Sequence, residues 1–261
     1  MHLMSRPRRT MLAGVGVAAA AVTAVTAVTG APAAVADDGW HAGTDRVYRV
    51  TILNLTDGQP FTPPVVATHQ RRVDVFEVGS PADEGVVEIA ENGDTSFLEE
   101  ALAGNPRVAD VHVGSAPVLS NVTADGVPAE FRNFTSFEIT ADARANRLSW
   151  VSMIICSNDG FTGVDSVRLP NRVGRSVVEY TEAYDAGSEV NSQRFGDIVP
   201  PCQGLVGVTG SPGTGASNPA LAEDGVITKH PNVTEATEDG LQPEPHGWQG
   251  PVAQVVVTRV A

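Results

Sequence analysis

Two stretches near the two ends of the chain show an alternating pattern. In residues 46–55 one face carries Tyr48, Val50 and Ile52 and the other carries Val47, Arg49 and Thr51. In residues 252–260 one face carries Ala253, Val255 and Val257 and the other carries Val252, Gln254, Val256 and Thr258. A period of two residues is typical of a strand that buries one face. We expect these two strands to pair with each other, which would pin both ends of the domain.

Between these two stretches, short apolar runs are separated by Gly, Asn, Asp and Pro. Several short strands at this spacing are typical of a β-sandwich or barrel. Phe134, Phe137 and Ile139 are expected to lie in its core. The predicted strands cover residues 108–113, 131–140, 148–155, 164–169 and 177–184.

Two short helices are predicted in one insertion. Ser80 followed by Pro81 is typical of a helix start, and Gly93 is placed to end that helix. Residues 96–99 (SFLE) have the pattern of a capping box, and Gly104 would close the second helix. The sequence therefore predicts an all-β fold, an antiparallel β-sandwich with one or two short helices.

The first 36 residues have the composition of a secretion signal. Three arginines precede an apolar run rich in Ala, Val and Thr, and residues 34–36 (AVA) form a small-residue cleavage site. General secretory and twin-arginine export are both open, and a retained anchor is the alternative. We expect residues 37–261 to form a single domain that is secreted, extracellular or associated with the cell envelope. No later segment has the ~18 consecutive apolar residues of a membrane span.

The chain is acidic, with a formal net charge of −14 over 261 residues. Removal of residues 1–36 takes away three arginines and no acidic residue, so the net charge becomes −17. This balance argues against nucleic acid or an anionic membrane as a direct partner.

Cys156 and Cys202 are the two cysteines. An even cysteine count in an exported chain favours a disulfide, here between the loop after strand 148–155 and residues 200–204. Two free thiols, or a Cys156 nucleophile with a histidine partner, are the alternatives. The histidines are scattered and form no H-E-x-x-H pair, so the sequence predicts no zinc site.

Two polar loops that contain glycine carry candidate metal ligands. Asp159 follows the apolar run 151–155, and Asp185 and Glu189 flank Gly187. If the loops meet, their carboxylates repel one another unless a cation is bound, and calcium takes six to eight oxygens. We predict one calcium ion at these three acids. Ordinary acidic turns, or a glycosidase-like Asp159/Asp185 pair in an extracellular hydrolase, are the alternatives.

The chain resembles the spondin-type domain, the N-terminal module of F-spondin and mindin, in its single-domain bacterial secreted form. The matching motifs cover nearly the whole expected mature chain in a consistent order. They are residues 54–61 (NLTDGQPF), 63–66 (PPVV), 90–94 (AENGD), 152–161 (SMIICSNDGF), 184–189 (YDAGSE) and 250–253 (GPVA).

The resemblance implies an antiparallel β-sandwich with a calcium site at one end, whose family ligands fall on Asp159, Asp185 and Glu189. Two positions depart from the family pattern. Glu189 stands where the family has Asp, and Gly160 stands where the animal proteins have an aromatic residue. The implied function is non-catalytic adhesion or recognition of an extracellular or cell-surface ligand, protein or glycan. A purely structural envelope protein is a further alternative.

Overall fold

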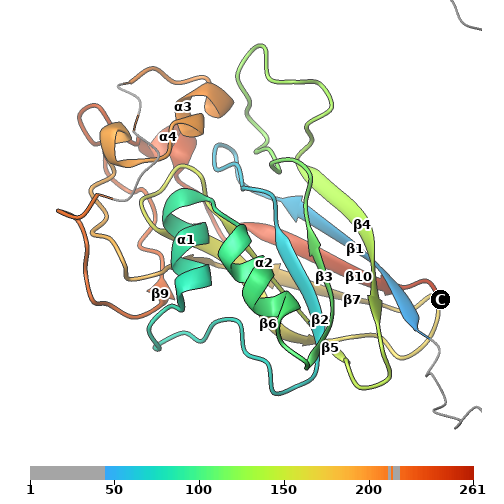
Figure 1. The fold of residues 1–261 in the computed structure, drawn as a ribbon. Helices are drawn as coiled ribbons and strands as arrows, with labels where there is room; N and C mark the ends of the chain where they lie inside the picture. The colour runs from blue at the N-terminus through green and yellow to red at the C-terminus, as the bar shows by residue number, and fades with distance from the viewer. Residues whose placement is uncertain (1–44, 211–212, 214–217) are drawn as a thin grey trace, which may run out of the picture. The chain divides into compact units, whose positions relative to one another are not determined.

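The computed structural model describes residues 45–210, 213 and 218–261, so the expected signal segment lies outside the described residues. Ten strands and a few short helices make up this part of the chain (Figure 1). The strands are β1 (Arg46–Asn54), β2 (Val65–His69), β3 (Val108–Val113), β4 (Phe134–Ala141), β5 (Arg147–Met153), β6 (Gly160–Arg168), β7 (Ser176–Thr181), β8 (Ala183–Asp185), β9 (Thr228–Lys229) and β10 (Ala253–Arg259). The helices are α1 (Glu84–Asn92), α2 (Ser96–Ala103), α3 (Pro201–Val206), α4 (Pro243–His246) and the 3₁₀ turn η1 (Phe195–Asp197).

The strands form two antiparallel sheets, which confirms the predicted all-β sandwich. One sheet has the strand order β4-β1-β10-β7, and the other has the order β3-β2-β5-β6-β8-β9. The two alternating terminal strands pair as predicted, because β1 and β10 lie side by side from the Tyr48–Arg259 pair to the Asn54–Ala253 pair. The core between the sheets contains the inward side chains of β1 and β10, including Val50 and Val255.

The strands β2 and β5 are buried along nearly their whole length, because the six-stranded sheet is covered on both faces. Val66 and Trp150 point into the core shared with the four-stranded sheet. Val65 and Val151, each one residue away, point to the opposite face and pack under α1 and α2. A strand covered on both faces has no polar side, which explains the continuous apolar run in this part of the sequence.

The two short helices lie where they are predicted, but their starts differ from the expectation. Helix α1 begins at Glu84 rather than at Ser80, whose hydroxyl bonds Glu77 instead of a helix N–H. The predicted capping box at Ser96 is wrong. Ser96 is the first residue of α2 rather than its N-cap. The Asp94 carboxylate accepts the Ser96 N–H at 2.9 Å and so satisfies one of the donors that the first turn leaves free.

Two further expectations need correction. Phe134 is 47% exposed, whereas Ile139 is fully buried and Phe137 is partly buried against the core. The predicted strand 177–184 is divided into β7 and β8, which belong to different sheets. The break lets the chain cross from one sheet to the other, and β8 then delivers Asp185 beside the start of β6.

Candidate metal centre

Asp159 lies in the connection between β5 and β6, directly before the pairing of Gly160 with Asp185. The turn is closed by Ser157, whose Oγ accepts the N–H of Gly160 at 3.0 Å. A side chain at position 160 would meet that Oγ at 2.4 Å and the His230 ring at 3.2 Å. Ser157 and His230 thus occupy the space beside Gly160, which gives a physical reason for glycine at this position.

The second loop is held by its own glycine and by two amide groups. The N–H of Gly187 donates to Asp185 Oδ1 at 2.9 Å, and Gly187 has a φ of +71°. A Cβ there would lie 2.7 Å from the backbone N of Val226, so glycine is required for both conformation and space. Asn191 donates its side-chain amide to the other oxygen of Asp185.

The two polar loops meet as predicted, and the contact runs through Asp159. Its Oδ2 accepts the backbone N–H groups of Ser188 at 2.9 Å and Glu189 at 3.1 Å. Its own carbonyl accepts the N–H of Ala186 at 3.1 Å. The side chains of Asp159, Asp185 and Glu189, here called the carboxylate centre, are all buried.

The carboxylate centre is buried without a positively charged partner among the described residues, and burial disfavours its charged form. Burial, and then the charge of Asp185, raise the pKa of Asp159 to about 6. Burial also raises the pKa of Glu189 to about 7, against the opposing effect of the Asn218 N–H, which donates to Glu189 Oε1 at 3.0 Å. In the part of the chain that the structure describes, none of these three carboxylates forms an ion pair.

One carboxylate oxygen of the centre could accept a further interaction. Asp159 Oδ1 is buried and has no hydrogen-bond partner. A buried carboxylate oxygen without a partner is costly, and a bound cation would remove that cost together with the repulsion from Asp185. Oxygen donors of this type fit a hard cation such as calcium.

The three acids do not close around a single point. Among the described residues, the one group of three potential ligands with donor atoms within 4.8 Å of one another is Cys156, Cys202 and His246. Calcium holds its oxygen ligands at about 2.3–2.6 Å, which places opposite ligands roughly 5 Å apart. Carbonyl groups or water would complete the shell.

Some residues around the centre were missed by reasoning from the sequence. Asn191 and Asn218 hydrogen-bond the carboxylates, and only Asn191, two residues after Glu189, is signalled by its position in the loop. His230 packs on Trp248 with ring centroids 5.2 Å apart. Its Nε2 is buried and has no partner. No sequence pattern joins His230 to Gly160.

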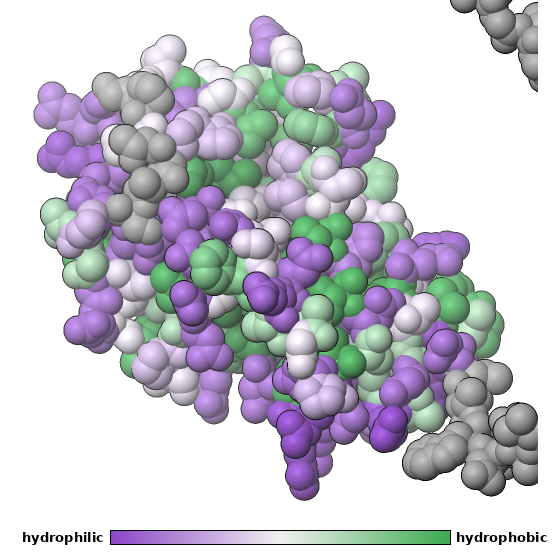
Figure 2. Space-filling model, in the orientation of Figure 1, coloured by the Kyte–Doolittle hydropathy of each residue, from purple (hydrophilic) through white to green (hydrophobic). Residues whose placement is uncertain are grey.

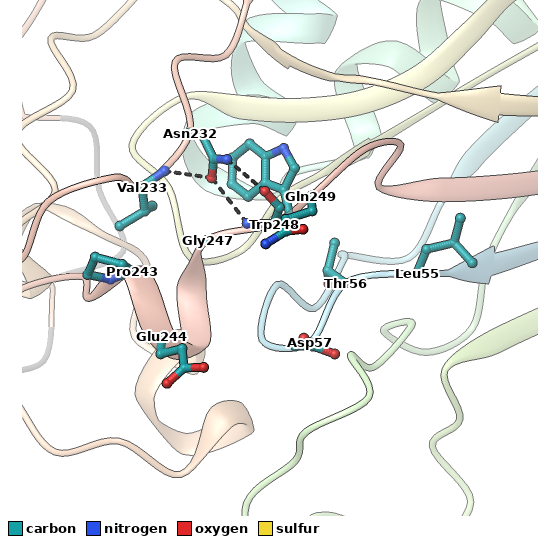
Figure 3. A pocket seen from close by; sticks show the side chains of 10 residues that line it. All are labelled: Leu55, Thr56, Asp57, Asn232, Val233, Pro243, Glu244, Gly247, Trp248 and Gln249. Carbon is teal, nitrogen blue, oxygen red and sulfur yellow. Dashed lines mark hydrogen bonds between the residues drawn. The ribbon is translucent and has the colours of Figure 1, made fainter.

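A cavity of about 500 Å³ is lined in part by Trp248, the residue that packs on His230 (Figure 3). Asn232 fixes its wall, since its side chain bonds the Val233 N–H at 2.7 Å and the Trp248 carbonyl at 2.8 Å. Asp57 and Glu244 stand on different walls of this cavity (Figure 3). Neither Asp159 nor Asp185 lines it, so this cavity and the carboxylate centre are separate features.

The expected disulfide is confirmed, because Cys156 and Cys202 are bonded with a Cα–Cα distance of 5.1 Å. The bridge excludes the alternatives of two free thiols and of a Cys156 nucleophile. No helix in the described residues has the length and apolar character needed to cross a bilayer.

The sequence profile of the Spondin_N family matches residues 55–192, more than half of the chain, and this segment contains all three acids of the carboxylate centre. No curated protein matches the chain. The two-sheet fold and the profile match agree, and the chain belongs to the spondin N-terminal domain family.

Proposed function

We propose that this protein is a secreted, non-catalytic recognition module that binds one calcium ion at Asp159, Asp185 and Glu189. The family match supports an extracellular spondin-like module. The observation that carries the calcium proposal is Asp159 Oδ1, a buried carboxylate oxygen without a partner beside a second acid.

Calcium would act by holding the two polar loops together. Asp159 already binds the loop of Asp185 and Glu189 through the Ser188 and Glu189 N–H groups. A cation on the remaining oxygens would neutralise the charges that oppose this contact. The ion therefore supplies stability and a rigid loop surface rather than a reaction step.

The recognition surface is proposed to lie at the metal end of the sandwich. A cavity of about 300 Å³ there has a mixed lining: residues 186–188 of the metal loop, residues 223–225, and the apolar side chains of Pro81, Ala82 and Val87. The face drawn in Figure 2 is rich in hydrophilic side chains, with smaller apolar groups between them. A polar extracellular or cell-surface ligand, protein or glycan, fits this surface better than a lipid does.

The alternative function, an extracellular hydrolase that uses Asp159 and Asp185, rests on the raised pKa of Asp159. Against this alternative, a substrate cannot easily reach Asp159. Asp159 is fully buried, and its Oδ2 is occupied by two backbone N–H groups. A general acid or nucleophile must reach a substrate, so this geometry favours the binding module.

The test is thermal unfolding with excess EDTA and then with millimolar calcium, for the wild type and for Asp159→Asn and Asp185→Asn. At about 100 times its dissociation constant, an ion adds roughly 2.7 kcal/mol, which is about 5–10 °C for a domain of this size. We expect this rise in the wild type and in the control Glu100→Gln, an exposed acid on α2, but in neither Asp variant. An unchanged melt in the wild type would rule out the calcium site.

The export proposal has its own readout. Protein recovered from the culture medium should begin at Asp37, which intact-mass measurement detects. Retention of all product inside the cells would count against it.

A further inference from the structure

The disulfide lies in a cluster that contains a third potential metal ligand. The sulfur atoms of Cys156 and Cys202 and a ring nitrogen of His246 lie within 4.8 Å of one another. All three residues are fully buried. They come from three separate segments, namely the turn after β5, helix α3 and helix α4.

The ring of His246 is placed as in a metal-binding histidine. Its Nδ1 lies 3.0 Å from the backbone N and 3.2 Å from the backbone O of Gln242, so Nδ1 has a partner in either tautomer. Its Nε2 is buried and has no partner. A ligating histidine commonly donates its second ring N–H to a carbonyl, and Nδ1–H to Gln242 O would leave the Nε2 lone pair free.

Gln59 supplies a fourth polar group at the same place. Its side-chain amide donates to the carbonyls of Cys156 at 3.1 Å and His246 at 2.7 Å, so it bridges two of the three candidate ligands. The oxygen of the same amide is buried without a partner. We name Cys156, Cys202, His246 and Gln59 the sulfur–histidine cluster.

The surroundings of the cluster are apolar, which favours soft ligands over water. Phe195 meets the His246 ring edge-on, with centroids 5.9 Å apart. Ile198, Val206 and Leu241 belong to the same buried core as the two cysteines. Burial also lowers the pKa of His246, which favours the neutral imidazole that metal binding requires.

The family match does not account for this cluster. The matched segment ends at residue 192, so Cys202 and His246 lie outside it. As a disulfide, the two sulfurs carry no thiolate and are poor ligands. Two thiolates and one imidazole, however, are a ligand set that zinc accepts.

We propose that reduction of the Cys156–Cys202 disulfide converts the sulfur–histidine cluster into a zinc site with Cys156, Cys202 and His246 as ligands. A dithiol supplies two electrons and two protons, the sulfur–sulfur bond breaks, and the dithiol becomes a disulfide. Zinc then replaces the two thiol protons, which are released to solvent. Gln59 Oε1 or a water molecule fills the fourth position.

In this proposal the metal replaces the covalent bond as the crosslink between the same segments. The turn that carries Asp159 is anchored at Cys156 in both states. The proposal is independent of calcium, because it uses none of the three acids of the carboxylate centre.

The test is a cobalt and zinc titration of the full chain, reduced with excess dithiothreitol in denaturant, refolded and freed of reductant without oxygen. We expect one cobalt ion per chain, a thiolate-to-cobalt charge-transfer band and displacement by zinc. The oxidised protein should show no such band. His246→Gln should weaken binding at least about 10-fold, whereas His112→Gln, the same change on β3, should not.

A measurement on the wild type covers the case in which His246→Gln fails to fold. The ¹¹³Cd resonance of the reduced, cadmium-loaded protein should report two sulfurs and one nitrogen, and ¹⁵N-labelled histidine should show coupling to the metal. The absence of stoichiometric cobalt binding by the reduced protein, or a cadmium site without histidine coupling, would overturn the proposal.

Discussion

The carboxylate centre and the sulfur–histidine cluster begin three residues apart, at Asp159 and Cys156, yet their chemistry is opposite. The first holds buried acids whose partners are backbone N–H groups and amides. The second holds sulfur and imidazole in an apolar core. The turn after β5 therefore contributes to two clusters, one of carboxylate oxygens and one of sulfur and imidazole.

The difference also concerns how each site is stabilised. The sulfur–histidine cluster is held together by a covalent bond, the Cys156–Cys202 disulfide. The carboxylate centre has an unpartnered oxygen and two raised pKa values, so a bound cation would stabilise it. We expect the two sites to contribute separately to stability.

Removal of the disulfide is expected to change the free energy of unfolding most. The cysteines are 46 residues apart, and loop entropy predicts a loss of about 4 kcal/mol for Cys156→Ala combined with Cys202→Ala. Urea unfolding of the double variant measures this loss. The stabilisation by calcium should persist in it. Loss of the calcium effect would show that the two sites are not independent.

The pH dependence without calcium is the next largest effect. The pKa of Asp159 is raised from 3.8 to about 6 and that of Glu189 from 4.5 to about 7, so the folded state binds more protons than the unfolded state between these values. The stabilisation by the protonated forms of Asp159 and Glu189 is full below about pH 4 and is lost as pH rises through 6 and 7. Asp159 contributes at most about 3 kcal/mol of this free energy of unfolding.

Urea unfolding in EDTA from pH 4 to pH 8 measures this dependence. The difference between the wild type and Asp159→Asn isolates the contribution of one carboxyl group. With saturating calcium the fall in wild-type stability should disappear. An identical pH profile for the two proteins would contradict the raised pKa.

The smallest expected effect is that of Asp159→Asn on stability, and its sign should depend on whether calcium is present. In EDTA at pH 7.5, Asp159→Asn should stabilise the protein by about 1–2 kcal/mol, because a neutral amide keeps an acceptor for the Ser188 N–H and removes a buried charge. With calcium the same variant should be the less stable protein. Destabilisation in both buffers would mean that Asp159 acts only as a structural acceptor.

The sequence predicts local features of this fold well. Alternation in residues 46–55 and 252–260 is enough to predict β1, β10 and their pairing, because both strands have one buried face. The buried run after residue 150 correctly places Asp159 at a strand exit. The helix starts were predicted less well, because the neighbouring carboxylates take part instead: Ser80 donates its hydroxyl to Glu77, and Ser96 donates its backbone N–H to Asp94.

Long-range contacts set the limit of sequence reasoning. Gln59 meets the His246 carbonyl across 187 residues, and His230 reaches Gly160 from a different strand connection. No periodicity encodes such neighbours. For the same reason, scattered histidines do not predict that His246 lies against the disulfide.

Calcium titration calorimetry tests the central claim most directly. We predict one ion per chain with a dissociation constant of roughly 10⁻⁴ to 10⁻³ M, as in extracellular calcium modules. Asp159→Asn and Asp185→Asn should each weaken binding at least about 10-fold, and Glu100→Gln should leave it unchanged. No saturable binding to the wild type, or equal binding by Asp159→Asn, would contradict the account.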